Sequence, residues 1–105
     1  TMAYTRAGVS PDGSASYFLP RLVGHAKAMQ LILMNDLLTA QQAKEWGLVN
    51  EVVADDQLMP RVMEVAHQLA KGATLAYGEA KRLVADSFSN TIETQMEMET
   101  RAISG

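Results

Sequence analysis

The strongest candidate for chemistry in this sequence is an aspartate in a short loop that contains two glycines. The run Gly8-Val9-Ser10-Pro11-Asp12-Gly13 follows an apolar lead-in, and Asp12 stands just ahead of an expected helix start. Glycine lets the backbone bend, and Pro11 fixes its own φ directly before the acid. Such a loop can aim a carboxylate into a cleft as a general base. The plainer interpretation is a turn with a helix cap at Ser14 or Ser16.

Composition restricts the classes of protein to which the chain can belong. Its 105 residues make one domain at most, and a net charge of -3 leaves no basic surplus for nucleic acid. Cysteine is absent, and no spacing of His25, His67 and the carboxylates suggests a metal site. No apolar run reaches the ~18 residues of a membrane span, and no signal peptide is visible. We therefore expect a cytoplasmic protein with no nucleic-acid, membrane or metal partner.

The elements that must position Asp12 are expected to be mostly helices. Apolar spacing predicts helices over residues 14–23 and 25–34, and Thr39 and Gln42 form a capping box that opens a helix ending at Trp46. Three more helices are expected: one from a cap at Asp55-Asp56 to Gly72, one from a cap at Thr74 to Phe88, and one from a cap at Asn90 to Ile103.

Two short stretches are predicted to be strands. Residues 48–53 are rich in β-branched side chains and follow Gly47, which stands where a left-handed helix C-cap belongs. Residues 2–4 are expected to end another strand. The sequence therefore predicts a mostly α chain with one or two short strands.

Several runs, in this order, resemble the enoyl-CoA hydratase/isomerase (crotonase) superfamily, over essentially the whole chain. One run alone would be a weak signal, because turns and A-x-x-A helices are common. The matching runs are Gly8-Val9-Ser10-Pro11-Asp12-Gly13, Leu19-Pro20-Arg21-Leu22-Val23-Gly24, Ala28-Met29-Gln30-Leu31, Leu38-Thr39-Ala40-Gln41-Gln42-Ala43, Trp46-Gly47-Leu48-Val49-Asn50-Glu51-Val52-Val53 and Ala80-Lys81-Arg82-Leu83.

The resemblance implies that residues 1–105 are the C-terminal part of a crotonase-like domain, truncated at both ends. The parent fold would be an α/β superhelix of ββα units, followed by helices. Enzymes of this family bind acyl-CoA thioesters without a further cofactor and stabilise a thioester enolate with two backbone N–H groups. Those donors come from the first half of the family's domain, so we expect the 105-residue chain alone to be inactive. The family forms trimers or hexamers, which implies a homo-oligomer.

The resemblance also implies roles for individual residues. Family hydratases use two glutamates, and one of them falls at the position of Tyr4; they also tend to have glycine where this chain has Asp12. An acid at the Asp12 position occurs in isomerases of the phenylacetate-degradation type, where it shuttles a proton, and in aromatic acyl-CoA dehalogenases, where it is a nucleophile. We therefore expect Asp12 to be catalytic, with Tyr4 and Gly13 in the substrate pocket.

An enoyl-CoA isomerase that shifts a double bond or a ring is the function that this pattern favours. Two alternatives within the family stay open, an enoyl-CoA hydratase and an aromatic acyl-CoA dehalogenase. An alternative of another class is a non-catalytic fragment whose only activity is self-association.

Overall fold

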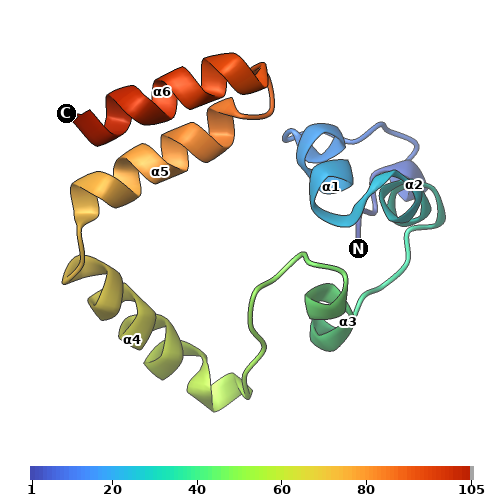
Figure 1. The fold of residues 1–105 in the computed structure, drawn as a ribbon. Coiled ribbons are helices and arrows are strands. Elements are labelled where there is room, and N and C mark those ends of the chain that lie inside the picture. Colours follow the sequence, from blue (N-terminus) through green and yellow to red (C-terminus); the bar gives the residue numbers. More distant parts are fainter. Residues whose placement is uncertain (105) are drawn as a thin grey trace. The chain divides into compact units, whose positions relative to one another are not determined.

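Helices make up the regular structure of residues 1–104, the part of the chain that this computed structural model describes (Figure 1). The chain divides into two units, the first comprising Thr1–Ala54 and the second beginning at Asp55. The first unit contains the 3₁₀ helix η1 (Thr5–Ala7) and the α-helices α1 (Ala15–Val23), α2 (His25–Met34) and α3 (Ala40–Glu45). The second contains the 3₁₀ helix η2 (Asp55–Gln57) and the α-helices α4 (Leu58–Ala70), α5 (Thr74–Asp86) and α6 (Ile92–Ser104).

The core of the first unit lies where α1 packs against α2. Leu19 of α1 and Ala28 and Leu31 of α2 are buried against one another. Partly buried apolar side chains surround them, namely Met2, Val23, Ile32, Leu38, Trp46 and Leu48. This small core fixes α1, and the loop that carries Asp12 leads directly into that helix.

Local signals in the sequence predicted the helices of the first unit well. Thr39 and Gln42 form the expected capping box, in which the Gln42 N–H donates to the Thr39 hydroxyl at 3.1 Å and the Thr39 N–H donates to the Gln42 side chain at 3.0 Å. Gly47 has the predicted left-handed backbone, with φ of 80°. Pro20 lies inside α1, and this helix has 9 residues.

Both strand predictions are wrong for the described residues. Residues 2–4 form a turn that leads into η1, and residues 48–53 form an irregular segment. A strand needs a second strand as its hydrogen-bonding partner, and residues 1–104 provide none. Instead, the Leu48 N–H donates to the Ala43 carbonyl at 2.8 Å and closes the end of α3.

Three of the predicted caps are also wrong. Asp55 and Asp56 lie within η2, and Gln57 occupies the N-cap of α4 without a side-chain cap bond. Ala73, rather than Thr74, is the N-cap of α5, because the Ala73 carbonyl accepts the first helical hydrogen bond from the Tyr77 N–H at 3.0 Å. At the start of α6 the cap bond comes from the Thr91 hydroxyl, which accepts from the Thr94 N–H at 3.3 Å, and not from Asn90.

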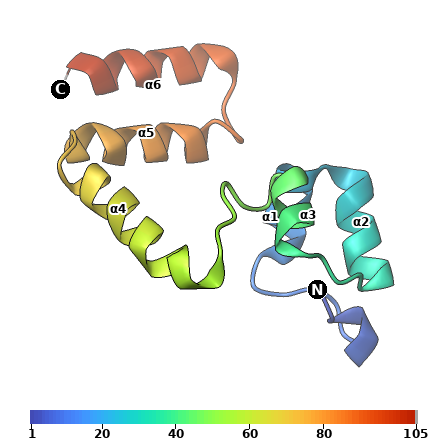
Figure 2. The same ribbon diagram turned by 90° about the horizontal axis from the view of Figure 1, so that it is seen from below.

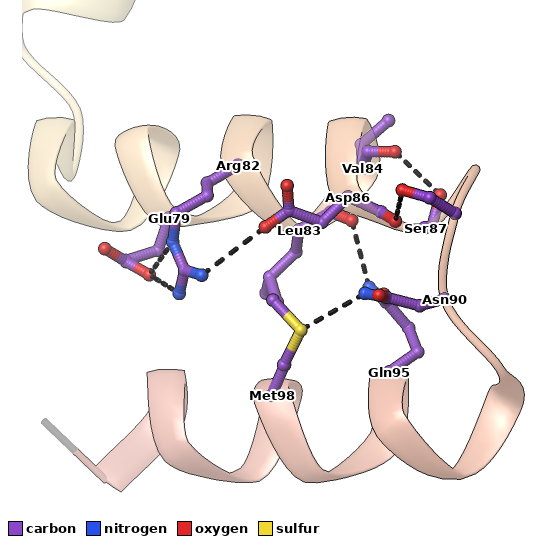
Figure 3. Close-up of polar contacts among 10 residues, drawn as sticks. Glu79, Arg82, Leu83, Val84, Asp86, Ser87, Asn90, Gln95 and Met98 are labelled. Atoms are coloured by element: carbon purple, nitrogen blue, oxygen red, sulfur yellow. Dashed lines mark hydrogen bonds and ion pairs between the residues drawn. The ribbon is translucent and has the colours of Figure 1, made fainter.

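Helices α5 and α6 form an antiparallel hairpin in the second unit (Figure 2). Figure 3 shows how polar side chains join the two helices across the turn. The Gln95 side chain donates to the Leu83 carbonyl at 2.9 Å, and the Asn90 amide donates to Gln95 at 3.0 Å and to the Met98 sulfur at 3.2 Å. Arg82 pairs with Glu79 on the same helix. Polar contacts therefore hold the hairpin, whose apolar side chains remain largely exposed.

Candidate functional site

The loop before α1 holds Asp12 at a defined place. Gly8 and Gly13 both have left-handed backbones, with φ of 75° and 57°, which a residue with a Cβ rarely adopts. The Asp12 carbonyl accepts a hydrogen bond from the Ala15 N–H at 3.0 Å. Ser14, with φ of 66°, stands at the N-cap position but makes no side-chain cap bond, so the predicted serine cap is not formed. Asp12 itself is exposed.

The electrostatic environment of Tyr4 depends on Asp12, which follows it eight positions later in the chain. A side-chain hydrogen bond to Asp12, followed by the negative charge of that carboxylate and by desolvation, raises the pKa of Tyr4. The raised pKa keeps the Tyr4 phenol protonated at neutral pH. The expectation that Tyr4 lines a substrate pocket stays a prediction.

Hydrogen bonds from the end of α2 anchor the segment that carries Tyr4. The Thr5 hydroxyl donates to the Ile32 carbonyl at 2.6 Å and accepts from the Asn35 amide at 2.8 Å. The Thr1 hydroxyl donates to the Asn35 carbonyl at 2.9 Å, and the Arg6 guanidinium donates to the same carbonyl at 3.4 Å. The residues on both sides of Tyr4 are thus tied to α2.

The sequence interpretation missed the role of Asn35. This residue is buried, with 7% of its surface exposed, and it ends α2 in a left-handed conformation with φ of 58°. An asparagine directly after an apolar helical repeat is the signal that marks such a C-terminal position. That signal locates the end of the helix, but it does not reveal the partner that the side chain binds.

Gly13 leaves open space beside Asp12. A Cβ built on Gly13 would meet no atom within 4 Å other than those of its chain neighbours, so the space at Gly13 itself is open. The structure thus places the three predicted site residues Tyr4, Asp12 and Gly13 in one region of the first unit. Chemically, the arrangement offers one carboxylate that can act as base or nucleophile, and a protonated phenol whose pKa that carboxylate raises.

Residues 1–104 also bear on metal binding and on membrane insertion. No group of three or more histidine, cysteine, aspartate or glutamate side chains among them is placed to hold a metal ion. The longest helices of this described part have 13 residues, and none has the length and hydropathy that a membrane span requires.

Comparison with known proteins gives one consistent family. The family model described as enoyl-CoA hydratase/isomerase matches residues 1–104. The 1,2-epoxyphenylacetyl-CoA isomerase of Escherichia coli K12 is 37% identical over 93% of the chain, and 4-chlorobenzoyl coenzyme A dehalogenase-1 of an Arthrobacter species is 38% identical over 96%. The crystal structure of an enoyl-CoA hydratase/isomerase from Cupriavidus metallidurans CH34 is 33% identical, with a TM-score of 0.92 over 96% of this chain and 38% of that one. The chain spans 37% of the length of the two curated relatives.

Proposed function

The chain belongs to the enoyl-CoA hydratase/isomerase family, and we propose that it is part of an acyl-CoA isomerase in which Asp12 moves the proton. We call the longer protein that would carry it the full-length enzyme. The observation that supports this function best is the pair of residue types at positions 4 and 12: a carboxylate at 12, and a phenol in place of a second carboxylate at 4. Hydration by the family's route needs carboxylates at two positions, and position 4 has none.

One carboxylate is enough for isomerisation. The ionised Asp12 takes a proton from one carbon of the acyl chain, and the electrons left behind form a thioester enolate. Two backbone N–H groups, which the family resemblance places in the first half of the domain, would stabilise the enolate oxygen. Asp12 then returns the proton to another carbon, so that the double bond has moved and nothing has been added. Coenzyme A enters as part of the substrate, and no further cofactor is required.

A dehalogenase would use the same carboxylate differently. The Arthrobacter relative is named a 4-chlorobenzoyl coenzyme A dehalogenase, and the E. coli relative is named an isomerase, at nearly the same identity. In the dehalogenase reaction, as the family resemblance implies it, Asp12 would attack the aromatic carbon and displace halide. Sequence identity does not distinguish these two activities, but the products of the reaction distinguish them.

Product analysis tests the proposed function. The full-length enzyme is expected to convert an enoyl-CoA into an isomer of the same mass, with little hydration of crotonyl-CoA, because position 4 supplies no second acid. Liquid chromatography with mass spectrometry distinguishes an isomer from a product that has gained one water. Efficient hydration of crotonyl-CoA would contradict the isomerase proposal. Release of halide from a 4-halobenzoyl-CoA would favour the dehalogenase.

Self-association is the second candidate function, and one observation favours it. An apolar groove of about 740 Å³ runs along α5 and α6, and the side chains of Leu75 and Ile103 that line it are each 88% exposed. Contiguous exposed apolar surface of this kind usually marks an interface. We propose a second copy of the chain as its partner, in line with the homo-oligomer that the family resemblance implies.

Light scattering tests the self-association of the 105-residue chain. The expected result is a mass above the 11.4 kDa of one chain at micromolar concentration, because burial of the groove's apolar side chains favours the oligomer. The variant Leu75→Glu is expected to shift the mass toward that of a monomer, and Leu37→Glu, a matched change at an exposed leucine in the first unit, is not. A monomer at high micromolar concentration would contradict the proposal.

A further inference from the structure

The thioether of Met98 is part of the polar network that joins α5 to α6 (Figure 3). Its sulfur accepts a hydrogen bond from the Asn90 side-chain amide at 3.2 Å. The same amide donates to the Gln95 side-chain oxygen at 3.0 Å, and the Gln95 amide donates in turn to the Leu83 carbonyl at 2.9 Å. A continuous chain of hydrogen bonds therefore runs from a sulfur atom on α6 to the backbone of α5.

The α5–α6 hairpin has few apolar contacts to support it besides this network. Neither of these two helices contains a buried residue. Leu75 and Val84 of α5 are 88% and 64% exposed, and Ile103 of α6 is 88% exposed. Segments with few buried apolar contacts are the ones that open locally at low cost in free energy. The loss of one hydrogen bond of the network is therefore expected to be felt by the whole hairpin.

Met98 brings into this network an atom that peroxide can oxidise. A lone pair of the sulfur attacks hydrogen peroxide, an S–O bond forms, the O–O bond breaks and water leaves, so that the sulfur is oxidised and the peroxide reduced. The product is a polar, chiral sulfoxide. An oxygen on the lone pair that faces Asn90 has no room within the 3.2 Å between nitrogen and sulfur. An oxygen on the other lone pair makes the sulfur a weaker acceptor.

We propose that Met98 is an oxidation site, and that its conversion to the sulfoxide breaks the link to Asn90 and loosens the α5–α6 hairpin. Met98 is half-buried, so peroxide reaches its sulfur. The inference is independent of the acyl-CoA chemistry proposed for Asp12. It bears on the apolar groove described above, because residues of both helices line that groove and its shape depends on the hairpin.

Hydrogen exchange before and after peroxide treatment tests the proposal in the 105-residue chain. Peptide mapping by mass spectrometry reports the fraction of Met98 that has gained one oxygen atom. We expect amide exchange in α5 and α6 to rise about 5–10-fold when Met98 is oxidised, which is the scale of losing a hydrogen bond. Reduction by methionine sulfoxide reductases A and B is expected to restore the original rates.

Two leucine variants separate Met98 from the other methionines. Met98→Leu removes the sulfur at similar volume, and its exchange in α5 and α6 is expected to be the same before and after peroxide. Met96→Leu is the matched control, because Met96 lies on the same helix and is 59% exposed. Residues two positions apart do not face the same way on a helix, so this variant is expected to respond to peroxide as the wild type does.

A third variant tests the route through the amide. Asn90→Ala is expected to exchange faster than the wild type before treatment and to show no further rise after it, because the link to the sulfur is already missing. A rise as large as that of the wild type would mean that the sulfoxide acts without Asn90, and this would overturn the proposed route.

Three results in the other samples would also overturn the proposal. Unchanged exchange in a wild-type chain with fully oxidised Met98 would show that the hairpin does not depend on the thioether. A rise that persists in Met98→Leu would assign the effect to another methionine. Failure of Met98 to react under conditions that fully oxidise Met96 would reject Met98 as an oxidation site.

Discussion

Asparagine in place of Asp12 is expected to lower kcat for isomerisation in the full-length enzyme by about 10²–10⁴-fold, the usual contribution of a positioned acid–base group. The amide keeps the size of the side chain and its oxygen can still accept a hydrogen bond, but it cannot take up a proton. Asp12 is exposed, so the change is expected to leave the stability of the first unit nearly unaltered. Steady-state kinetics on the preferred enoyl-CoA measure the loss.

Binding separates loss of the base from loss of the site. Asp12→Asn is expected to bind a non-reacting acyl-CoA thioether about as tightly as the wild type, because the carboxylate acts on the reacting carbon and not on coenzyme A. The control Asp36→Asn makes the same change in charge in the first unit and is expected to keep full activity. If Asp12→Asn retains near wild-type kcat, the assignment of Asp12 as the proton carrier is wrong.

The 105-residue polypeptide purified alone is expected to show no turnover of enoyl-CoA substrates. It spans 37% of the length of the isomerase and dehalogenase relatives, and the family resemblance places both oxyanion donors in the half of the domain that it does not contain. Removing a single such donor typically lowers kcat by about 10²–10³-fold, so the absence of both leaves the enolate without effective stabilisation. An absorbance assay for loss of the enoyl thioester measures the rate.

Two controls make this result interpretable. Circular dichroism must show that the isolated chain is helical, so that inactivity is not a consequence of unfolding. The full-length enzyme, assayed in parallel, must turn over the same substrate. Turnover by the isolated chain above that of a boiled sample would reject the expectation and would require a source of oxyanion stabilisation within residues 1–105.

Sequence patterns of short range predicted most of the helical structure. The apolar repeat of α2, the capping box of α3 and the left-handed Gly47 all depend on residues fewer than five positions apart, and all three are confirmed. The position of Asp12 just before α1 was also predicted correctly, from the residues of the loop that contains it. The effect of Asp12 on the pKa of Tyr4 was not, because it depends on how the chain reverses between the two residues.

Contacts between distant residues account for what the sequence interpretation missed. The β-branched side chains of residues 48–53 favour an extended backbone. A strand also requires a partner strand, and residues 1–104 do not supply one. The hydrogen bonds of Asn35 to Thr1 and Thr5 span 34 and 30 positions. No periodicity or turn rule identifies such partners.

The bonds around Asn35 determine which part of the molecule must stay intact for the site to exist. Thr1 and Thr5 hold the Tyr4 segment only while the last turn of α2 offers the Ile32 and Asn35 carbonyls as acceptors. Opening of that turn releases the segment that carries Tyr4, so the end of α2 and this segment form one cooperative unit in local unfolding. A fluctuation that frays this turn therefore releases the segment that carries Tyr4 even while the core formed by α1 and α2 remains packed.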